Sequence, residues 1–343
     1  MSCLLLLFFC FSLLAQEEKL ESEEDSAFKK KLAEKRKKKE EEERKKEIIN
    51  AALFAEFRQG MRNTDVQIRL LSLTSLMKMK NPAKDFMITK ALEDVSPKIR
   101  MKVLEYFIKE KTTAHLNALS HVLEDHDVGV RKKIVETVLA YSDGKTNTFT
   151  LIENLLDDKQ SAVRMALVEG VKKFPKSMFK NKHLFDALRN SYFDTDQAIR
   201  ANAYSFISEF PLEFSYSYLE SAINDSQIKT RKQILEIVAK IPDKKTLKLM
   251  TTALTDPYPP IRSRCVELLS ENMNKDIINV LDNRLLSEKN YKLRRQMMEA
   301  LAKKPNARVV TIISRGLKDP VLEVRRRAAS LLEEIQVRVN RKK

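Results

Sequence analysis

The chain has 343 residues, of which 43% are hydrophobic and 33% charged, and its formal net charge is +16. This length allows one elongated domain or two compact ones, and abundant Leu, Lys, Glu and Ala with no Trp are typical of a helical protein. Only five glycines are present, which argues against a glycine-rich phosphate-binding loop, while the positive charge favours anionic partners of any kind.

The N-terminus carries a continuous apolar run from Cys3 to Ala15. The run is shorter than the roughly 20 residues that a membrane-spanning helix needs. It matches the apolar core of a secretory signal with small Ala15 at the cleavage edge, so residues 1–15 are predicted to be a signal peptide. The lack of a Lys or Arg before the run, and the large Leu13, fit this interpretation poorly.

Two alternatives to a cleaved signal stay open. Lipidation of Cys10 is one, although a bacterial lipobox needs a small residue where Phe9 stands. An uncleaved anchor or a wrongly assigned start codon is the other. With the signal removed, Cys265 is the single thiol, so no internal disulfide can form. We expect an exported protein, periplasmic or associated with the cell envelope, with no transmembrane span in the mature chain.

Residues 16–47 form a charged segment with twelve basic and twelve acidic side chains, so the whole positive excess lies after residue 47. Glu and Lys favour helices, and opposite charges three or four residues apart add weak support. No a/d heptad pattern is sustained, which argues against a stable coiled coil despite a coiled-coil-like composition. The segment is predicted to be a helical or partly disordered spacer. A docking helix is the alternative, and the mixed charge argues against a nucleic-acid arm.

From residue 48 onwards a short motif recurs along the chain. In nine copies an acid or amide precedes an arginine by six residues, and the arginines are 31, 31, 33, 36, 31, 31, 32 and 31 residues apart. Such a period indicates a solenoid built from one supersecondary unit per repeat. The copies read NTDVQIR (63–69), DVSPKIR (94–100), DHDVGVR (125–131), DKQSAVR (158–164), DTDQAIR (194–200), DSQIKTR (225–231), DPYPPIR (256–262), EKNYKLR (288–294) and DPVLEVR (319–325).

Each period divides into two helices joined by a turn that carries the acid. An amphipathic helix such as TFTLIENLLDD precedes the acid, and a second helix starts near the arginine. Residues three and seven positions after the arginine share one helix face and are apolar except for Ser72, so this face is the predicted core. Cys265 belongs to it and is predicted to be a small buried hydrophobe. About five extra residues around KKFPKSMFKNKH should bulge from a loop between repeats.

This pattern resembles the HEAT repeat family, including the bacterial HEAT-like repeats of the phycobilisome-lyase type, over roughly residues 48–343. The resemblance implies an all-α fold, a right-handed α-solenoid (α-α superhelix) of about nine HEAT-like helical hairpins. It also implies a structural ladder, in which each turn acid pairs with an arginine of its own or a neighbouring copy, with weaker rungs at Asn63 and Glu288. The implied ladder residues are Asp94, Arg100, Asp125, Arg131, Asp158, Arg164, Asp194, Arg200, Asp225, Arg231, Asp256, Arg262, Asp319 and Arg325.

No catalytic, cofactor or metal site is predicted. His121 and His126 are five residues apart, which is wrong for one helix face, and no paired-cysteine, nucleophile-elbow or zinc-protease motif occurs. The remaining candidate is a partner-binding basic stripe beside the ladder arginines, which the resemblance places on a concave surface. Ordinary solvated helix surface is its alternative. The stripe comprises Lys102, Lys132, Lys133, Lys232, Arg264, Arg295, Arg326 and Arg327.

Three functions are compatible with these features. The leading hypothesis is a non-enzymatic exported scaffold that binds a protein partner or an anionic envelope polymer through the solenoid surface. Nucleic-acid binding or DNA repair, as in HEAT-like alkylpurine DNA glycosylases, is favoured by the +16 charge and opposed by the export signal and the absence of Trp. A phycobilisome-lyase-like helper protein is the third, and it rests on the resemblance alone.

Overall fold

The computed structural model describes residues 2–141 and 146–340, with side chains from residue 30 onwards except residues 32 and 146. Every regular element in these residues is a helix. The chain divides into two units, Met1–Tyr106 and Phe107–Lys343. The predicted all-α fold is therefore confirmed for the part of the chain that the structure describes.

The first unit begins with a single long helix, α1 (Ser2–Gly60). It runs through the boundaries predicted at residues 15 and 47, so the spacer takes the helical form of the two that were predicted. The predictions of a signal peptide at residues 1–15 and of lipidation at Cys10 concern side chains outside the described residues. Within the described residues, no helix combines the length and the apolar character that crossing a membrane requires.

The rest of the first unit carries the first two motif copies. It contains α2 (Val66–Lys78), α3 (Lys84–Lys90), a 3-10 turn at Ala91–Glu93 and α4 (Pro97–Glu110), whose last turn belongs to the second unit. The N-cap of α2 is Asp65, whose carboxylate accepts hydrogen bonds from the N–H groups of Gln67 and Ile68. An acidic N-cap of this kind satisfies N–H groups that have no partner within the helix, which is why the second helix begins there.

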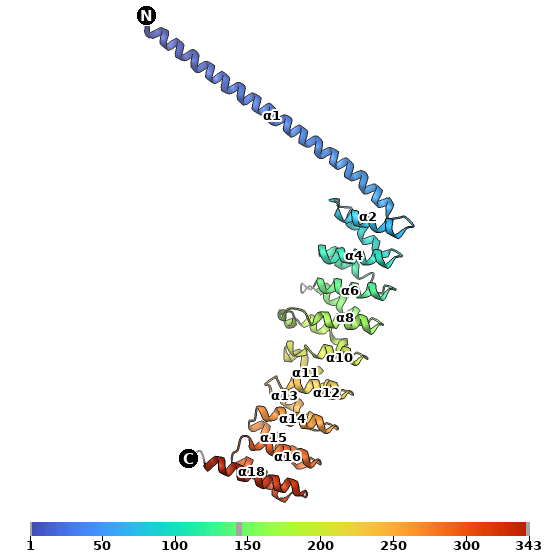
Figure 1. The fold of residues 1–343 in the computed structure, drawn as a ribbon, viewed down its shortest axis with the longest axis vertical. Coiled ribbons are helices and arrows are strands. Elements are labelled where there is room, and N and C mark those ends of the chain that lie inside the picture. Colours follow the sequence, from blue (N-terminus) through green and yellow to red (C-terminus); the bar gives the residue numbers. More distant parts are fainter. Residues whose placement is uncertain (1, 142–145, 341–343) are drawn as a thin grey trace. The chain divides into compact units, whose positions relative to one another are not determined.

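The second unit is a stack of seven helical hairpins. In each one a first helix leads through the acid-bearing turn into a second helix (Figure 1). The pairs are α5 (Thr113–Leu119) with α6 (Val128–Ala140), α7 (Thr146–Leu155) with α8 (Ser161–Val171), α9 (Lys182–Ala187) with α10 (Gln197–Tyr204), α11 (Leu212–Ala222) with α12 (Ile228–Val238), α13 (Lys244–Ala253) with α14 (Pro259–Glu271), α15 (Lys275–Ser287) with α16 (Tyr291–Ala302), and α17 (Ala307–Arg315) with α18 (Leu322–Asn340).

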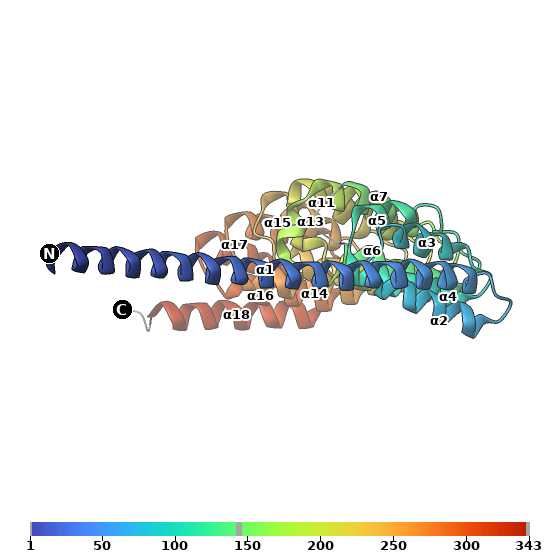
Figure 2. The same ribbon diagram turned by 90° about the horizontal axis from the view of Figure 1, so that it is seen from above.

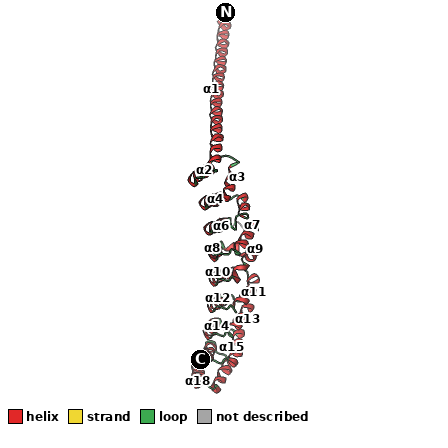
Figure 3. Ribbon diagram, turned by 90° about the vertical axis from the view of Figure 1, so that its right-hand side faces the viewer, coloured by secondary structure: helices red, strands yellow, loops and turns green. Residues whose placement is uncertain are grey.

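First and second helices of this unit form two layers. Figure 2 views them with α11, α13, α15 and α17 along one side and α14, α16 and α18 along the other. Figure 3 shows the second helices α6 to α14 following one another in chain order. Each second helix from α6 onwards contacts the next one. Neighbouring hairpins therefore bury each other's apolar faces, as one hairpin alone could not.

The predicted core face is buried. All nine residues three positions after the arginine are 6% exposed or less, and Cys265 is fully buried. Seven positions after the arginine, eight of nine residues are at most 2% exposed, and Leu332 of the last copy is only half-buried. The core prediction is confirmed with that one difference, since no further described hairpin covers α18.

The extra residues between Arg164 and Arg200 are mostly exposed, as expected for an insertion in a loop, with one buried exception. They form a 3-10 turn at Lys176–Lys180 that places Phe179 in the core at 2% exposure. The Phe179 ring lies 5.7 Å from the ring of Phe206 and 5.0 Å edge-on from that of Phe210. The Phe179 side chain therefore anchors an otherwise largely exposed insertion to the core.

Candidate functional site

The acid of each motif first organises its own turn. In all nine copies the side chain of this acid, or of Asn63 in the first copy, accepts a hydrogen bond from the backbone N–H two residues further on, for example from Ser96 N–H to Asp94 at 2.8 Å. The motif arginine donates from Nη1 to the backbone carbonyl of that acid or amide position, as from Arg231 to Asp225 at 2.8 Å. Both contacts lock the turn on the start of the second helix.

In seven of the nine copies the remaining guanidinium nitrogens reach into the next repeat. Nε and Nη2 of one arginine donate to the two carboxylate oxygens of the following turn acid, with Nε–O distances of 2.6 to 3.1 Å. No side chain in these pairs is more than 12% exposed. The pairs are Arg69–Asp94, Arg131–Asp158, Arg164–Asp194, Arg200–Asp225, Arg231–Asp256, Arg262–Glu288 and Arg294–Asp319.

At two rungs the arginine lowers the pKa of its aspartate partner. Burial by itself raises the pKa of Asp194, but the Arg164 guanidinium and the N–H of Asp196 outweigh it, so the pKa is lowered. At Asp319 the hydrogen bond from Arg294 is the main cause of a lowered pKa. A bidentate Arg–carboxylate pair is strongly directional, so each rung fixes the register of two hairpins.

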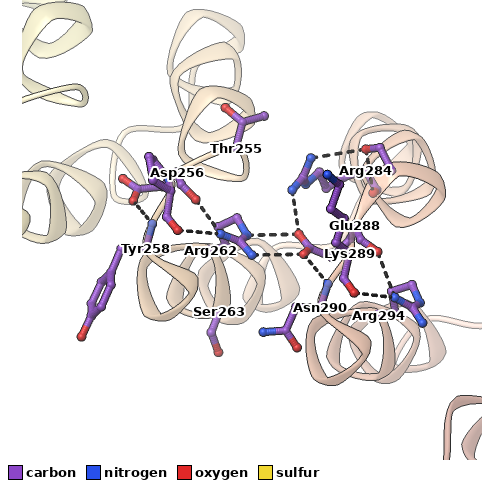
Figure 4. A network of polar contacts seen from close by, with 12 residues as sticks. Thr255, Asp256, Tyr258, Arg262, Ser263, Arg284, Glu288, Lys289, Asn290 and Arg294 are labelled. Atoms are coloured by element: carbon purple, nitrogen blue, oxygen red, sulfur yellow. Dashed lines mark hydrogen bonds and ion pairs between the residues drawn. The ribbon is translucent and has the colours of Figure 1, made fainter. Parts of the chain in front are cut away.

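Glu288, expected to form a weaker rung, binds two guanidinium groups. Figure 4 shows its carboxylate between Arg262, which donates two bonds of 3.1 Å, and Arg284, which donates one of 2.7 Å. Its Oε1 also accepts the N–H of Asn290 at 2.9 Å. Burial raises the pKa of Glu288, but these donors together lower it below its ordinary range.

Five of the eight residues in the predicted basic stripe contact glutamates. Those five do not add to a continuous free cationic surface, because their charge is balanced locally. Lys132, Lys232 and Arg326 are exposed and have no ion-pair partner among the described residues. The contacts are Lys102–Glu105, Lys133–Glu136, Arg264–Glu236, Arg295–Glu299 and Arg327–Glu299.

Two of these contacts form a second set of links between repeats. Arg264 of α14 binds both carboxylate oxygens of Glu236 on α12, at 2.6 and 3.1 Å. Arg327 of α18 likewise reaches Glu299 on α16 at 2.7 Å. In both cases the basic residue follows the ladder arginine of its own repeat by two positions. The glutamate follows the ladder arginine of the preceding repeat by five positions. The hydrogen bond from Arg264 lowers the pKa of Glu236.

A groove crosses the beginnings of three successive second helices, α12, α14 and α16. We call it the turn groove. Its volume is about 580 Å³, within the ~300–1,000 Å³ range of protein ligand sites. Its lining comprises Ile228, Lys232, Tyr258, Pro259, Pro260, Ile261, Ser263, Arg264, Glu267, Asn290, Lys292, Leu293 and Gln296.

The turn groove combines exposed apolar side chains with free cations. Ile228 is 44% exposed and Tyr258 43%. Lys232 and Lys292 are exposed and lack an ion-pair partner within the described part of the chain. The three repeats are held together beneath it by the rungs Arg231–Asp256 and Arg262–Glu288.

Sequence reasoning found Lys232 and Arg264 but missed the other groove residues. Ile228 stands three positions before its ladder arginine and Tyr258 four positions before, where the periodic core pattern requires no apolar residue. That excess of apolar character in the turns was the available signal.

A second hollow of about 750 Å³ includes His121, His126, Asp157 and Asp158. Among the residues that the structure describes, no three His, Cys, Asp or Glu side chains are grouped to hold a metal ion.

Stacked hairpins joined by buried Arg–carboxylate rungs define a helical solenoid with HEAT-like repeats. Kap121p, a solved structure, is similar with a TM-score of 0.51 and 13% identity, over 82% of this chain and 37% of that one. Human deoxyhypusine hydroxylase aligns with a TM-score of 0.32 and 15% identity, over 84% and 98%. YibA of E. coli aligns with a TM-score of 0.39 and 16% identity, over 79% and 98%.

At these identities the similarities concern the fold alone. No protein-family model matches the chain, and no curated protein matches it. The finer resemblance to the phycobilisome-lyase type therefore stays a prediction.

Proposed function

We propose that the protein is a non-enzymatic interaction scaffold that binds a protein partner through the turn groove. The observation that carries this proposal is the combination of exposed Ile228 and Tyr258 with unpaired lysines in a groove built by three successive repeats. Exposed tyrosine among polar residues is typical of protein-binding hot spots. Solved structures of Kap121p bound to Nup53p and to Ste12p supply a fold-level analogy only.

Preorganisation supports the proposal. The rungs on each side of α14 fix the spacing of the three turns before any partner arrives. A surface already held in its binding geometry loses less conformational entropy on association than a mobile one. Repeat proteins commonly present binding surfaces of this stacked kind.

The test is affinity capture from cells that express the protein. The full-length chain would be compared with an Ile228→Ala/Tyr258→Ala variant and with a control, Leu286→Ala, which removes a 70% exposed leucine outside the groove. The expected result is a partner retained by the wild type and the control and lost by the groove variant. Identical partner sets for all three proteins would overturn the proposal.

Nucleic-acid binding is the second candidate, favoured by the +16 charge and by exposed Lys132, Lys232 and Arg326. It requires tight binding of oligonucleotides with a steep dependence on salt, because phosphate contacts release counterions. A titration at two salt concentrations tests it, and affinity that is weak and independent of salt removes it. Copurification of a tetrapyrrole would instead favour the lyase-like helper.

Export is proposed with the scaffold function, and it is supported only by the apolar run from Cys3 to Ala15. N-terminal sequencing of the fractionated native protein tests it. A mature start near Gln16 in an extracytoplasmic fraction is expected. An intact Met1 in the cytosol would contradict export and leave the groove proposal standing.

A further inference from the structure

We propose that the occupant of the turn groove is an extended acidic peptide segment, in which an apolar side chain is flanked by carboxylates. This inference rests on the proposed function, since it names the chemistry of the partner at the same groove. It follows from the distribution of charge, apolar surface and space in the groove.

The net charge that the groove offers to a ligand comes from two lysines. Lys232 on α12 and Lys292 on α16 are exposed and form no ion pair with any described residue. Arg264 adds little, because its guanidinium is already bound by Glu236 and Glu267. The lysines without an ion pair therefore lie on the two outer helices. Between them, Arg264 with Glu236 of α12 and Glu267 of α14 forms a cluster with one excess negative charge.

The apolar surface belongs to α12 and α14. Ile228 begins α12, and Tyr258 precedes Pro259 and Pro260 at the start of α14. Ile228 and Tyr258 are each more than 40% exposed, and both line the groove. Burying a ligand's leucine or phenylalanine against them would contribute roughly 25 cal/mol per Å² of apolar area removed from water.

A peptide matches this arrangement better than a polymer of phosphates does. Glu267 lines the groove and Glu236 lies next to it on α12. A continuous phosphate chain laid from Lys232 to Lys292 would meet these carboxylates and be repelled. A peptide can place its carboxylates at the two lysines and turn an apolar residue towards the middle.

The dimensions agree with a short extended segment. Neighbouring packed helices lie about 10 Å apart, so three of them span about 20 Å. An extended chain rises by about 3.3 Å per residue, so about six residues cross the groove. Gln296 and Ser263 line the groove, and Ser263 Oγ donates to Gln296 Oε1 at 2.8 Å between α14 and α16. Gln296 Nε2 already donates to Ser263 and Glu267, so these two side chains would offer a peptide backbone the remaining lone pairs of their oxygens.

The experiment measures the anisotropy of fluorescein-labelled peptides of about eight residues against the full-length protein. One peptide carries a central Phe between glutamates, and its matched partner carries glutamines instead. The glutamate peptide should bind at least about tenfold more tightly than the glutamine peptide at low salt, and the difference should shrink as salt rises.

Protein variants locate the binding. The Lys232→Glu/Lys292→Glu variant should bind the glutamate peptide with an affinity at least about tenfold lower than that of the wild type. The control Lys275→Glu/Lys318→Glu changes the net charge equally at exposed positions outside the groove and should bind as the wild type does. Tyr258→Ala should lower the affinity for both peptides. Circular dichroism establishes that all the variants fold.

Three results would overturn the inference. The first is equal, groove-dependent binding of the two peptides, which would leave the proposed scaffold function intact. The second is tighter binding of an oligonucleotide of equal charge at the same lysines, which would favour the nucleic-acid candidate. The third is the absence of saturable binding of the glutamate peptide up to about 1 mM.

Discussion

Replacing Glu288 with glutamine should destabilise the C-terminal repeats more than any other single amide substitution in the ladder. The substitution keeps the size of the side chain and removes its charge. Three hydrogen bonds from guanidinium groups, at 3.1, 3.1 and 2.7 Å, lose their anionic acceptor. Arg262 and Arg284 are left with cationic groups that are only 11% and 21% exposed.

The magnitude follows from this burial. The Glu288 side chain is 1% exposed, so water cannot replace the lost carboxylate without opening the interface. Removing one partner of a buried ion pair costs about 3–5 kcal/mol, because an uncompensated charge remains. For a unit of this size each kcal/mol corresponds to roughly 2–4 °C in Tm, so the local transition should fall by roughly 6–20 °C.

Thermal unfolding followed by circular dichroism would measure the shift, and hydrogen exchange would locate it. Repeats interact mainly with their neighbours, so amides of α14 and α16 should lose protection while those of α8 keep it. Glu288→Asp is the matched control, because it retains the charge that the other rungs carry as aspartate. It should lose less stability than the amide.

A loss of stability below about 1 kcal/mol for Glu288→Gln would refute the reasoning, since the two arginines would then be solvated without cost. Equal loss of protection in α8 and α16 would refute the nearest-neighbour part of it. An aspartate variant less stable than the glutamine variant would show that side-chain length, and not charge, governs this rung.

Three further predictions follow from the described contacts. The lowered pKa values of Glu288, Asp194 and Asp319, below ordinary values of 4.5, 3.8 and 3.8, mean that the unfolded chain protonates first as pH falls. Stability should therefore be complete above about pH 5 and decline as pH falls through the folded-state values, and acid titration of the Tm should show a smaller decline in Glu288→Gln. Burial raises the pKa of the Cys265 thiol, so peptide mapping after treatment with a thiol reagent should find Cys265 unmodified in the native protein and modified in denaturant. Phe179→Ala should cost about 3–5 kcal/mol in denaturant unfolding, because Phe179 is 2% exposed, and a loss below about 1 kcal/mol would contradict its place in the core.

The repeat and the core were predictable because they depend on spacing along one helix. Residues three and seven positions after each arginine share a face whatever the neighbouring helix does, and they are buried, with Leu332 as the half-buried exception. The acid and the arginine that form the rungs were recognisable for the same reason, since each occupies a fixed position in a recurring turn.

Contacts between hairpins were not predictable, because they depend on how far one helix is offset from the next. The sequence allowed each acid to pair within its own copy or with a neighbour, and the stacking selects the arginine of the preceding copy. Arg264 looked like a free cation until the fold brought Glu236 of α12 to it. The surplus positive charge in the sequence therefore did not show which cations are held in ion pairs.

By itself, the sequence determined the period, the helical hairpins, the buried face and the two residue types of the ladder, all of which are local properties of a helix or a turn. Only the tertiary structure decided that Glu288 takes two guanidinium groups, that Phe179 turns inward, and that Ile228, Tyr258 and Lys292 meet in one groove. These three outcomes join residues from different helices. The distances between these residues depend on packing and desolvation at the interfaces between helices. Neither can be deduced from the spacing of residues along the chain.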